Sequence, residues 1–167
     1  AEFAGARFFS DSVTGIDRAA RKVLCANRPP IAYDLLSINI GSTPRMDDVT
    51  GAAEFAVPVK PISAFNERWL ELRERIRKRG GTTRIAVVGG GAGGVEMALA
   101  MQHRLRNELS AAGRNPDDLV VHLLSAEPDI LPTHNARVRR AFARVLAERG
   151  ITVHRGSEVT AVEPGRL

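Results

Sequence analysis

Cysteine is almost absent from this 167-residue sequence, because Cys25 is the only one. A single cysteine excludes an internal disulfide and a cysteine-based metal cluster, and it suits a reducing compartment. The sequence also lacks an apolar run of 18 residues, and no signal-peptide pattern opens it. We therefore predict no membrane segment in this chain and a cytoplasmic location.

Lysine is nearly absent as well, since Lys22, Lys60 and Lys78 are the only lysines among 24 basic residues. The net charge of +5 raises the question of nucleic acid, but the arginines mostly alternate with glutamates, as in residues 67–79. Without zinc-finger or RNP-like motifs we predict no nucleic-acid partner. We also predict no metal site, because none of the four histidines has metal-ligand spacing. They are His103, His122, His134 and His154.

The first part of the chain, residues 1–56, has the pattern of a β-rich segment. Two β-prone runs around a polar turn, at 11–17 and 21–27, predict a hairpin. The apolar run from Leu35 to Ile40, closed by Gly41, is typical of a strand that is buried on both faces.

A helical period follows in residues 57–83, which we expect to form a linking helix. From residue 84 the order of elements becomes β-α-β-α-β-β, which predicts an α/β fold with a parallel sheet flanked by helices. The expected strands are 85–88, 119–124, 151–154 and 158–162, and the expected helices are 93–110 and 135–149.

Glycine occupies five of the six positions from Gly89 to Gly94, directly after a buried strand and before a helix. Gly89, Gly91 and Gly94 have the GxGxxG spacing. The first glycine permits a tight turn, the second lets a pyrophosphate approach the backbone, and the third lets helix and strand pack closely. The helix N-terminus then offers free N–H groups to the phosphates. The motif predicts a dinucleotide site. The alternative, a tight turn that binds no ligand, would not explain why five of six residues are glycine.

Other nucleotide folds fit the sequence less well. A P-loop needs a lysine after the glycines, and none is present. A short-chain dehydrogenase needs Tyr-x-x-x-Lys, but Ser37 stands four residues after Tyr33, the only tyrosine. A methyltransferase that binds S-adenosylmethionine uses a related glycine turn and stays a minor alternative.

Three stretches together resemble the pyridine nucleotide–disulfide oxidoreductase superfamily of flavoproteins with two dinucleotide sites. VVGGGAGGVEMA (87–98) is similar to its NAD(P)H-binding fingerprint, with Glu96 at the position of the family glutamate. VHLLSAEPDILP (121–132) resembles its second strand and the following turn, and YDLLSINIGSTPR (33–45) its second flavin-contacting segment. Within the superfamily, type II NADH dehydrogenase-like proteins and the flavoprotein module fused to selenide, water dikinase look most similar.

The resemblance implies a central fragment of a larger protein. Residues 1–56 would be part of an incomplete FAD domain, 57–83 the linking helix, and 84–167 a Rossmann-like NAD(P)H-binding domain truncated at its carboxy end. The implied reaction is hydride transfer from nicotinamide to FAD, which needs no catalytic acid or base from the chain. We expect FAD in the longer parent but not on this fragment. A non-catalytic dinucleotide-sensing or docking module is the alternative.

The resemblance also assigns cofactor-binding residues. The dinucleotide would contact Gly89, Gly90, Gly91, Ala92, Gly93, Gly94 and Glu96, and the flavin nucleotide Gly41, Ser42 and Arg45. Glu96 is open to another interpretation, in which the dipole at the start of the helix favours its charge. The electron acceptor, quinone or disulfide, stays open, as do a homodimer and attachment of the parent to the cytoplasmic face of a membrane.

The choice between NADH and NADPH depends on the end of the second strand. The family's ribose-binding acidic residue is replaced by Ser125, with Glu127 two residues later. Glu127 and Asp129 would repel a 2′-phosphate by about 1 kcal/mol each, although an arginine of the next helix could swing back. We therefore predict a modest preference for NAD(H), with NADP(H) binding more weakly.

Overall fold

The computed structural model describes residues 5–41, 46–78 and 80–167. The chain divides into two compact units, residues 1–41 and 42–167. We call them the first and the second unit and describe each by itself.

The first unit is a small antiparallel sheet of three strands in the order β1-β2-β3: β1 (Val13–Asp17), β2 (Lys22–Cys25) and β3 (Ile31–Ala32). The predicted hairpin is confirmed, since Val13 pairs with Cys25 and Asp17 with Lys22. The Asp11 carboxylate accepts hydrogen bonds from Asn27 and so closes the open end of the hairpin. No described residue of this unit is fully buried.

The predicted strand over 35–40 is wrong. Leu35 is 87% exposed and Ile40 88%, and the segment has no strand structure. A strand buried on both faces needs neighbours that supply hydrogen bonds at its edges and apolar layers over its faces. The described residues of the first unit supply neither to this segment.

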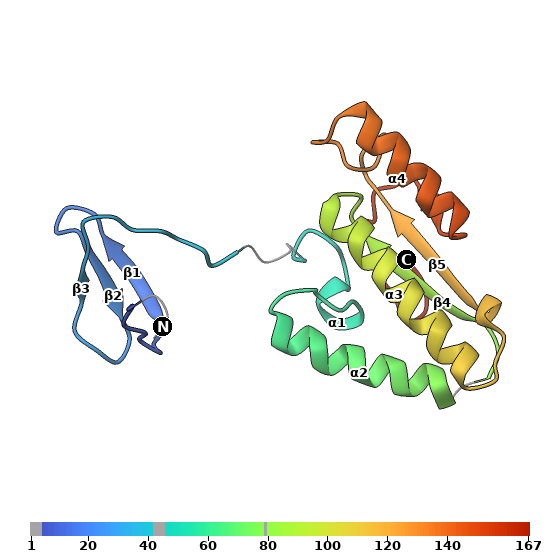
Figure 1. The fold of residues 1–167 in the computed structure, drawn as a ribbon, viewed down its shortest axis with the longest axis horizontal. Helices are drawn as coiled ribbons and strands as arrows, with labels where there is room; N and C mark the ends of the chain where they lie inside the picture. Colours follow the sequence, from blue (N-terminus) through green and yellow to red (C-terminus); the bar gives the residue numbers. More distant parts are fainter. Residues whose placement is uncertain (1–4, 42–45, 79) are drawn as a thin grey trace. The chain divides into compact units, whose positions relative to one another are not determined.

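The second unit is an α/β structure with a parallel sheet in the order β4-β5-β6. Figure 1 labels β4 and β5 of this sheet. Val88 of β4 pairs with Leu124 of β5, which in turn pairs with His154 of β6. The α/β fold predicted from the order of elements is confirmed. Its elements are α1 (Ala52–Phe55), α2 (Ile62–Lys78), β4 (Thr83–Val88), α3 (Ala92–Ala111), the short 3-10 helix η1 (Pro116–Asp118), β5 (Leu119–Leu124), α4 (Ala136–Glu148) and β6 (Thr152–His154).

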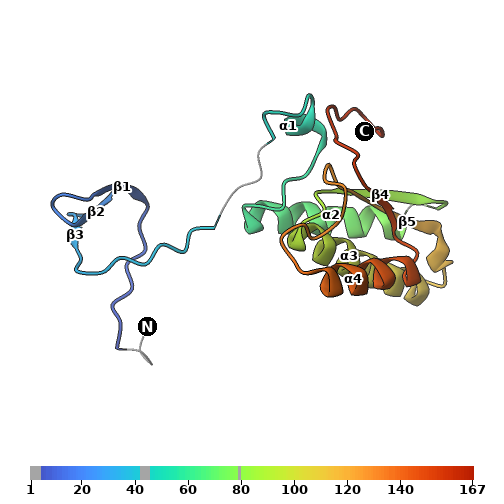
Figure 2. The ribbon, with the colours of Figure 1, turned by 90° about the horizontal axis from the view of Figure 1, so that it is seen from above.

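Helices α3 and α4 lie on the same side of the strands β4 and β5 (Figure 2). This follows from two right-handed crossovers that lead in the same direction across a parallel sheet. Alternate β5 residues, Leu119, Val121 and Leu123, are buried, and they join one core with residues of the helices. Those helical residues are Ile76, Val95, Ala98, Leu105, Leu109 and Leu146.

Helix α2 is held against α3 by polar contacts. The Arg73 guanidinium donates through Nε to Glu108 Oε1 at 2.8 Å, and Arg114, in the loop just after α3, donates to the carbonyl of Ile76. Trp69 and Leu72 of α2 pack on the core. The helix therefore belongs to the second unit and positions the start of β4.

The predicted strand over 158–162 is also wrong. Ala161 forms only an isolated parallel bridge with Thr50. After β6 the chain turns at Gly156, whose φ is +59°, and its N–H donates to the Glu127 carbonyl. This turn takes the segment away from the sheet. In the part of the chain that the structure describes, no helix has the length and apolar character needed to cross a membrane.

Candidate dinucleotide site

The glycine turn joins β4 to α3 at the carboxyl edge of the parallel sheet. Gly89 has a φ of +118°, which side chains rarely allow, and its N–H donates to the Leu124 carbonyl at 2.8 Å. The chain thus reverses direction tightly while it stays bonded to β5. Ligands of open parallel sheets bind at this edge.

Gly91 and Gly94 meet different surroundings, as the GxGxxG spacing requires. A Cβ on Gly94 would lie 1.8 Å from the Gly89 carbonyl oxygen, so only glycine lets α3 pack this close to the turn. A Cβ on Gly91 or Gly93 would meet nothing within 4 Å. The space over these two glycines is open, and a side chain there would fill the space that a pyrophosphate needs.

The start of α3 has no side-chain cap. Gly91 is the N-cap residue, its backbone is extended, and no side-chain hydrogen bond satisfies the first turn. Ala92 and Gly93 are exposed there. The first N–H groups of an α-helix lack intrahelical partners and carry the positive end of the helix dipole. The turn therefore presents donors and partial positive charge to an anion.

Glu96 is exposed. Since α3 begins at Ala92 and its first turn holds no acidic residue, Glu96 lies in the second turn. The dipole interpretation weakens with this placement, since the effect falls off within the first turn. Contact of Glu96 with the nicotinamide ribose stays a prediction.

Gly90 has a role that the sequence analysis missed. A Cβ on Gly90 would lie 2.3 Å from Ser125 Oγ, so the glycine turn rests directly on the end of β5. The Gly90 carbonyl accepts a 2.7 Å hydrogen bond from the N–H of Leu131. Ile130 and Leu131 are buried. Residues 130–132, the ILP end of the stretch 121–132, thus hold the glycine turn in place through the hydrogen bond of Leu131.

Ser125 is only 1% exposed. Its N–H donates to the His154 carbonyl at 2.8 Å, its carbonyl accepts from Ser157, and its side chain lies under Gly90. In this position the hydroxyl is shielded from a ligand at the surface. Glu127 by contrast is exposed.

Asp129 lies between two arginines. Its carboxylate is 3.7 Å from Arg139 Nε and 3.4 Å from Arg155 Nε. Two guanidinium groups near one carboxylate compensate its charge. The negative charge that the sequence analysis attributed to this position is thus offset by residues far along the chain.

The residues that the resemblance assigns to flavin contact lie earlier in the chain, at positions 41–45. Gly41 is exposed and has a φ of +71°, which suits a turn. Ser42 and Arg45 lie outside the described residues. Flavin contact by these three residues stays a prediction.

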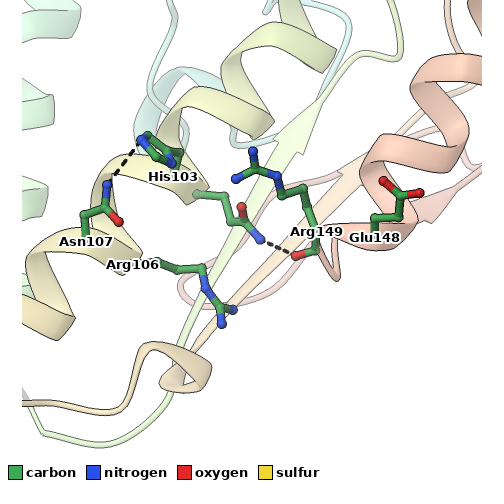
Figure 3. A pocket seen from close by; sticks show the side chains of 6 residues that line it. His103, Arg106, Asn107, Glu148 and Arg149 are labelled. Atoms are coloured by element: carbon green, nitrogen blue, oxygen red, sulfur yellow. Dashed lines mark hydrogen bonds between the residues drawn. The ribbon is translucent and has the colours of Figure 1, made fainter.

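Two further clusters were not visible in the sequence. Pairing of β5 with β6 brings His122 Nδ1 within 3.1 Å of His154 Nε2. Among the described residues, no group of three or more histidine, cysteine or acidic side chains is arranged to hold a metal ion. Figure 3 shows a polar recess between α3 and α4, where Gln102 donates to the Arg149 carbonyl beside His103.

This arrangement, a glycine turn at the carboxyl edge of a parallel sheet with two helices on one side, defines a Rossmann-like α/β unit. The family model of the pyridine nucleotide-disulphide oxidoreductases matches residues 4–166 of the chain. The chain belongs to this family. The resemblance found in the sequence is thereby confirmed.

Curated relatives carry related names. NADH dehydrogenase-like protein YutJ of Bacillus subtilis is 26% identical over 153 residues, which are 92% of this chain and 39% of the relative. Type II NADH:quinone oxidoreductase Ndh of Mycobacterium tuberculosis is 31% identical over 170 residues, which are 91% of this chain and 36% of the relative. The chain thus spans less than half the length of each of these proteins.

Solved structures show the same fold. NDH2 from Plasmodium falciparum in complex with NADH has a TM-score of 0.66 at 18% identity, over 93% of this chain and 35% of that one. Water-forming NADH oxidase from Lactobacillus brevis, bound to NADH, has a TM-score of 0.59 at 20% identity, over 90% of this chain and 30% of that one.

Proposed function

We propose that this chain is the central part of an FAD-dependent NADH dehydrogenase-like oxidoreductase and that its glycine turn binds the nicotinamide dinucleotide. The observation that carries the proposal is the difference between Gly91 and Gly94. The turn needs glycine at position 94 to pack, but it has open space over Gly91 that packing does not explain. Open space beside uncapped N–H groups suits a pyrophosphate.

The reaction proposed for the longer protein is hydride transfer from the nicotinamide to FAD, and the cofactors supply that chemistry. The residues of this chain bind and orient. Gly91 and Gly93 admit the pyrophosphate, the start of α3 donates hydrogen bonds to it, and Glu96 lies near the nicotinamide ribose. A cytoplasmic location and a homodimer stay predictions.

We further propose a modest preference for NADH over NADPH. Ser125 is neutral and buried, so it supplies no carboxylate to the ribose hydroxyls. Because Asp129 is compensated by Arg139 and Arg155, the repulsion of a 2′-phosphate rests on exposed Glu127 alone. One partly screened charge amounts to about 1 kcal/mol, or a preference of several-fold. Calorimetric titration of the chain with both dinucleotides would measure it, and a tenfold preference for NADPH would contradict it.

The proposed binding site is tested by Gly91→Val. A valine would fill the open space and block the pyrophosphate, and we expect the fold to persist because its Cβ would meet no atom within 4 Å. Gly80→Val is the matched control, since Gly80 also has open space around its Cβ position and lies before β4, away from the glycine turn. Isothermal titration with NADH should show binding by the wild type and by Gly80→Val and its loss in Gly91→Val. Equal binding by all three would contradict the proposal, as would no binding by any at millimolar NADH.

A further inference from the structure

Leu131 has a backbone conformation that a leucine rarely adopts. Its φ is +53°, in the left-handed region, although its side chain is bulky and only 3% exposed. The next residue is Pro132, and a proline favours extended backbone at the position before it. Two local preferences thus oppose the conformation of Leu131, so contacts elsewhere in the fold must hold it in place.

Among the described residues, Arg21 is the one other non-glycine residue with a positive φ, +51°. It is exposed and lies in the turn that joins β1 to β2, where a hairpin itself favours left-handed residues. Leu131 lies instead in the loop between β5 and α4. Strained residues outside such turns cluster where a function requires a defined backbone position. The hydrogen bond that Leu131 makes is the candidate for that requirement.

This hydrogen bond fixes one peptide of the glycine turn. The Leu131 N–H donates to the Gly90 carbonyl at 2.7 Å. That carbonyl and the N–H of Gly91 belong to the same planar trans peptide, so they point in opposite directions. Because the carbonyl is held towards Leu131, the Gly91 N–H is directed away from the loop that contains Leu131.

The Gly91 N–H has no acceptor within the part of the chain that the structure describes. Gly91 is exposed, whereas Gly90 is buried. A Cβ on Gly91 would meet nothing within 4 Å. The bond from Leu131 therefore turns one side of the peptide into the protein and leaves the donor on its other side available at the start of α3.

We propose that Leu131 is a positioning residue of the dinucleotide site, whose strained backbone aims the Gly91 N–H at the pyrophosphate. The inference rests on the proposed binding of the dinucleotide at the glycine turn. A donor that already points at its anion needs no reorientation when the ligand binds, and such preorganisation raises affinity. The hydrogen bond to a charged pyrophosphate is also stronger than one between neutral groups, so its direction matters more.

Leu131→Val tests the proposal, because a β-branched side chain does not tolerate a positive φ and would turn the N–H of residue 131 away from Gly90. Calorimetric titration of the full chain should show NADH affinity at least about tenfold weaker than in the wild type, as expected for one lost hydrogen bond to a charged group. Ile130→Val is the matched control. It also removes one methylene group from a buried side chain, at a residue without positive φ, and should leave the NADH affinity unchanged.

A purely structural role of Leu131 predicts a different pattern, in which both valine variants lower the thermal unfolding midpoint and neither lowers the NADH affinity. The scalar coupling across the hydrogen bond, from the ¹⁵N nucleus of residue 131 to the carbonyl ¹³C of Gly90, is the spectroscopic signature. It should be present in the wild type and in Ile130→Val and lost in Leu131→Val. Leu131→Met, whose side chain is not β-branched, should retain both the coupling and the affinity.

A measurement on the wild type decides the matter if Leu131→Val does not fold. Saturation with NADH should move the Gly91 amide proton downfield more than any other amide proton of the glycine turn. NADH binding without a shift of the Gly91 amide, or equal NADH affinity of the wild type and Leu131→Val, would overturn the inference and leave the dinucleotide site intact. No binding of NADH by the wild type would overturn both.

Discussion

The two units of the chain differ in what their own residues bury. The second unit has one continuous core that strands and helices share, with Leu105, Leu123 and Leu146 completely inaccessible. The first unit buries no described residue fully, and Phe8, Leu35 and Ile40 expose most of their surface.

The difference lies in where the partners of each strand come from. In the second unit β4 and β5 are each followed by a helix that packs against the sheet, so the covering layer is close in sequence. In the first unit the three strands follow one another directly, and no helix or second sheet among its described residues covers them. The strands of the first unit therefore have only exposed or half-buried positions.

The largest expected effect on the free energy of unfolding comes from truncating a side chain in the core of the second unit. Leu123→Ala should lower the free energy of unfolding of the second unit by about 2–5 kcal/mol, because Leu123 is completely buried. Leu35→Ala, at an exposed leucine of the first unit, should change it by less than about 0.5 kcal/mol. Urea unfolding followed by the fluorescence of Trp69, the only tryptophan, reports on the second unit. Similar losses in both variants would contradict the account.

A smaller effect tests the close packing of helix and turn. Gly94→Ala should destabilise the second unit by about 1–3 kcal/mol, because the added methyl group meets the Gly89 carbonyl. Gly93→Ala, one residue earlier in the same helix, meets no atom and should be neutral or slightly stabilising. Thermal unfolding of the two variants measures the difference. If both behave alike, the turn does not need glycine at position 94.

The smallest effect concerns the joint between α2 and α3. Hydrogen bonds from Arg73, and to a lesser degree from Arg104, lower the pKa of Glu108 although partial burial opposes the shift. A carboxyl group whose pKa is depressed in the folded state contributes stability above its unfolded pKa, and the contribution is lost as the pH falls through the folded pKa. Glu108→Gln should therefore cost about 1–2 kcal/mol near neutral pH.

The same comparison of the wild type with Glu108→Gln at low pH is the control for this variant. The unfolding free energies of the wild type and Glu108→Gln should converge as the pH falls below the usual range of a glutamate. A difference that stays constant down to acid pH would show that charge on Glu108 does not contribute. Glu74→Gln, at an exposed glutamate of α2 that pairs with Arg77, should change little at any pH.

The sequence predicted the three paired strands of the second unit and the helices α3 and α4 well, because their cues are local. The helical period located α3 and α4 to within one or two residues. A short apolar run such as 35–40 carries no information about whether neighbours are present to cover it. The same run is a buried strand or an exposed loop according to surfaces elsewhere in the protein.

The candidate site was only partly visible in the sequence. The GxGxxG spacing located the turn, because glycine reports a backbone requirement at its own position. The contact of Gly90 with Ser125 and the support from Leu131 join segments about 40 residues apart, and no local pattern encodes them. The pairing of Asp129 with Arg155 likewise depends on the neighbouring ends of β5 and β6.

The central claim is that the glycine turn of the second unit binds a nicotinamide dinucleotide. Residue-resolved ¹⁵N NMR shifts of the full chain during titration with NADH test it most directly. The account predicts saturable shifts of the amides from Gly89 to Gly94 and at the start of α3, with the strands β1 to β3 unchanged. Saturable shifts confined to other parts of the chain, with the glycine turn unaffected, would contradict it.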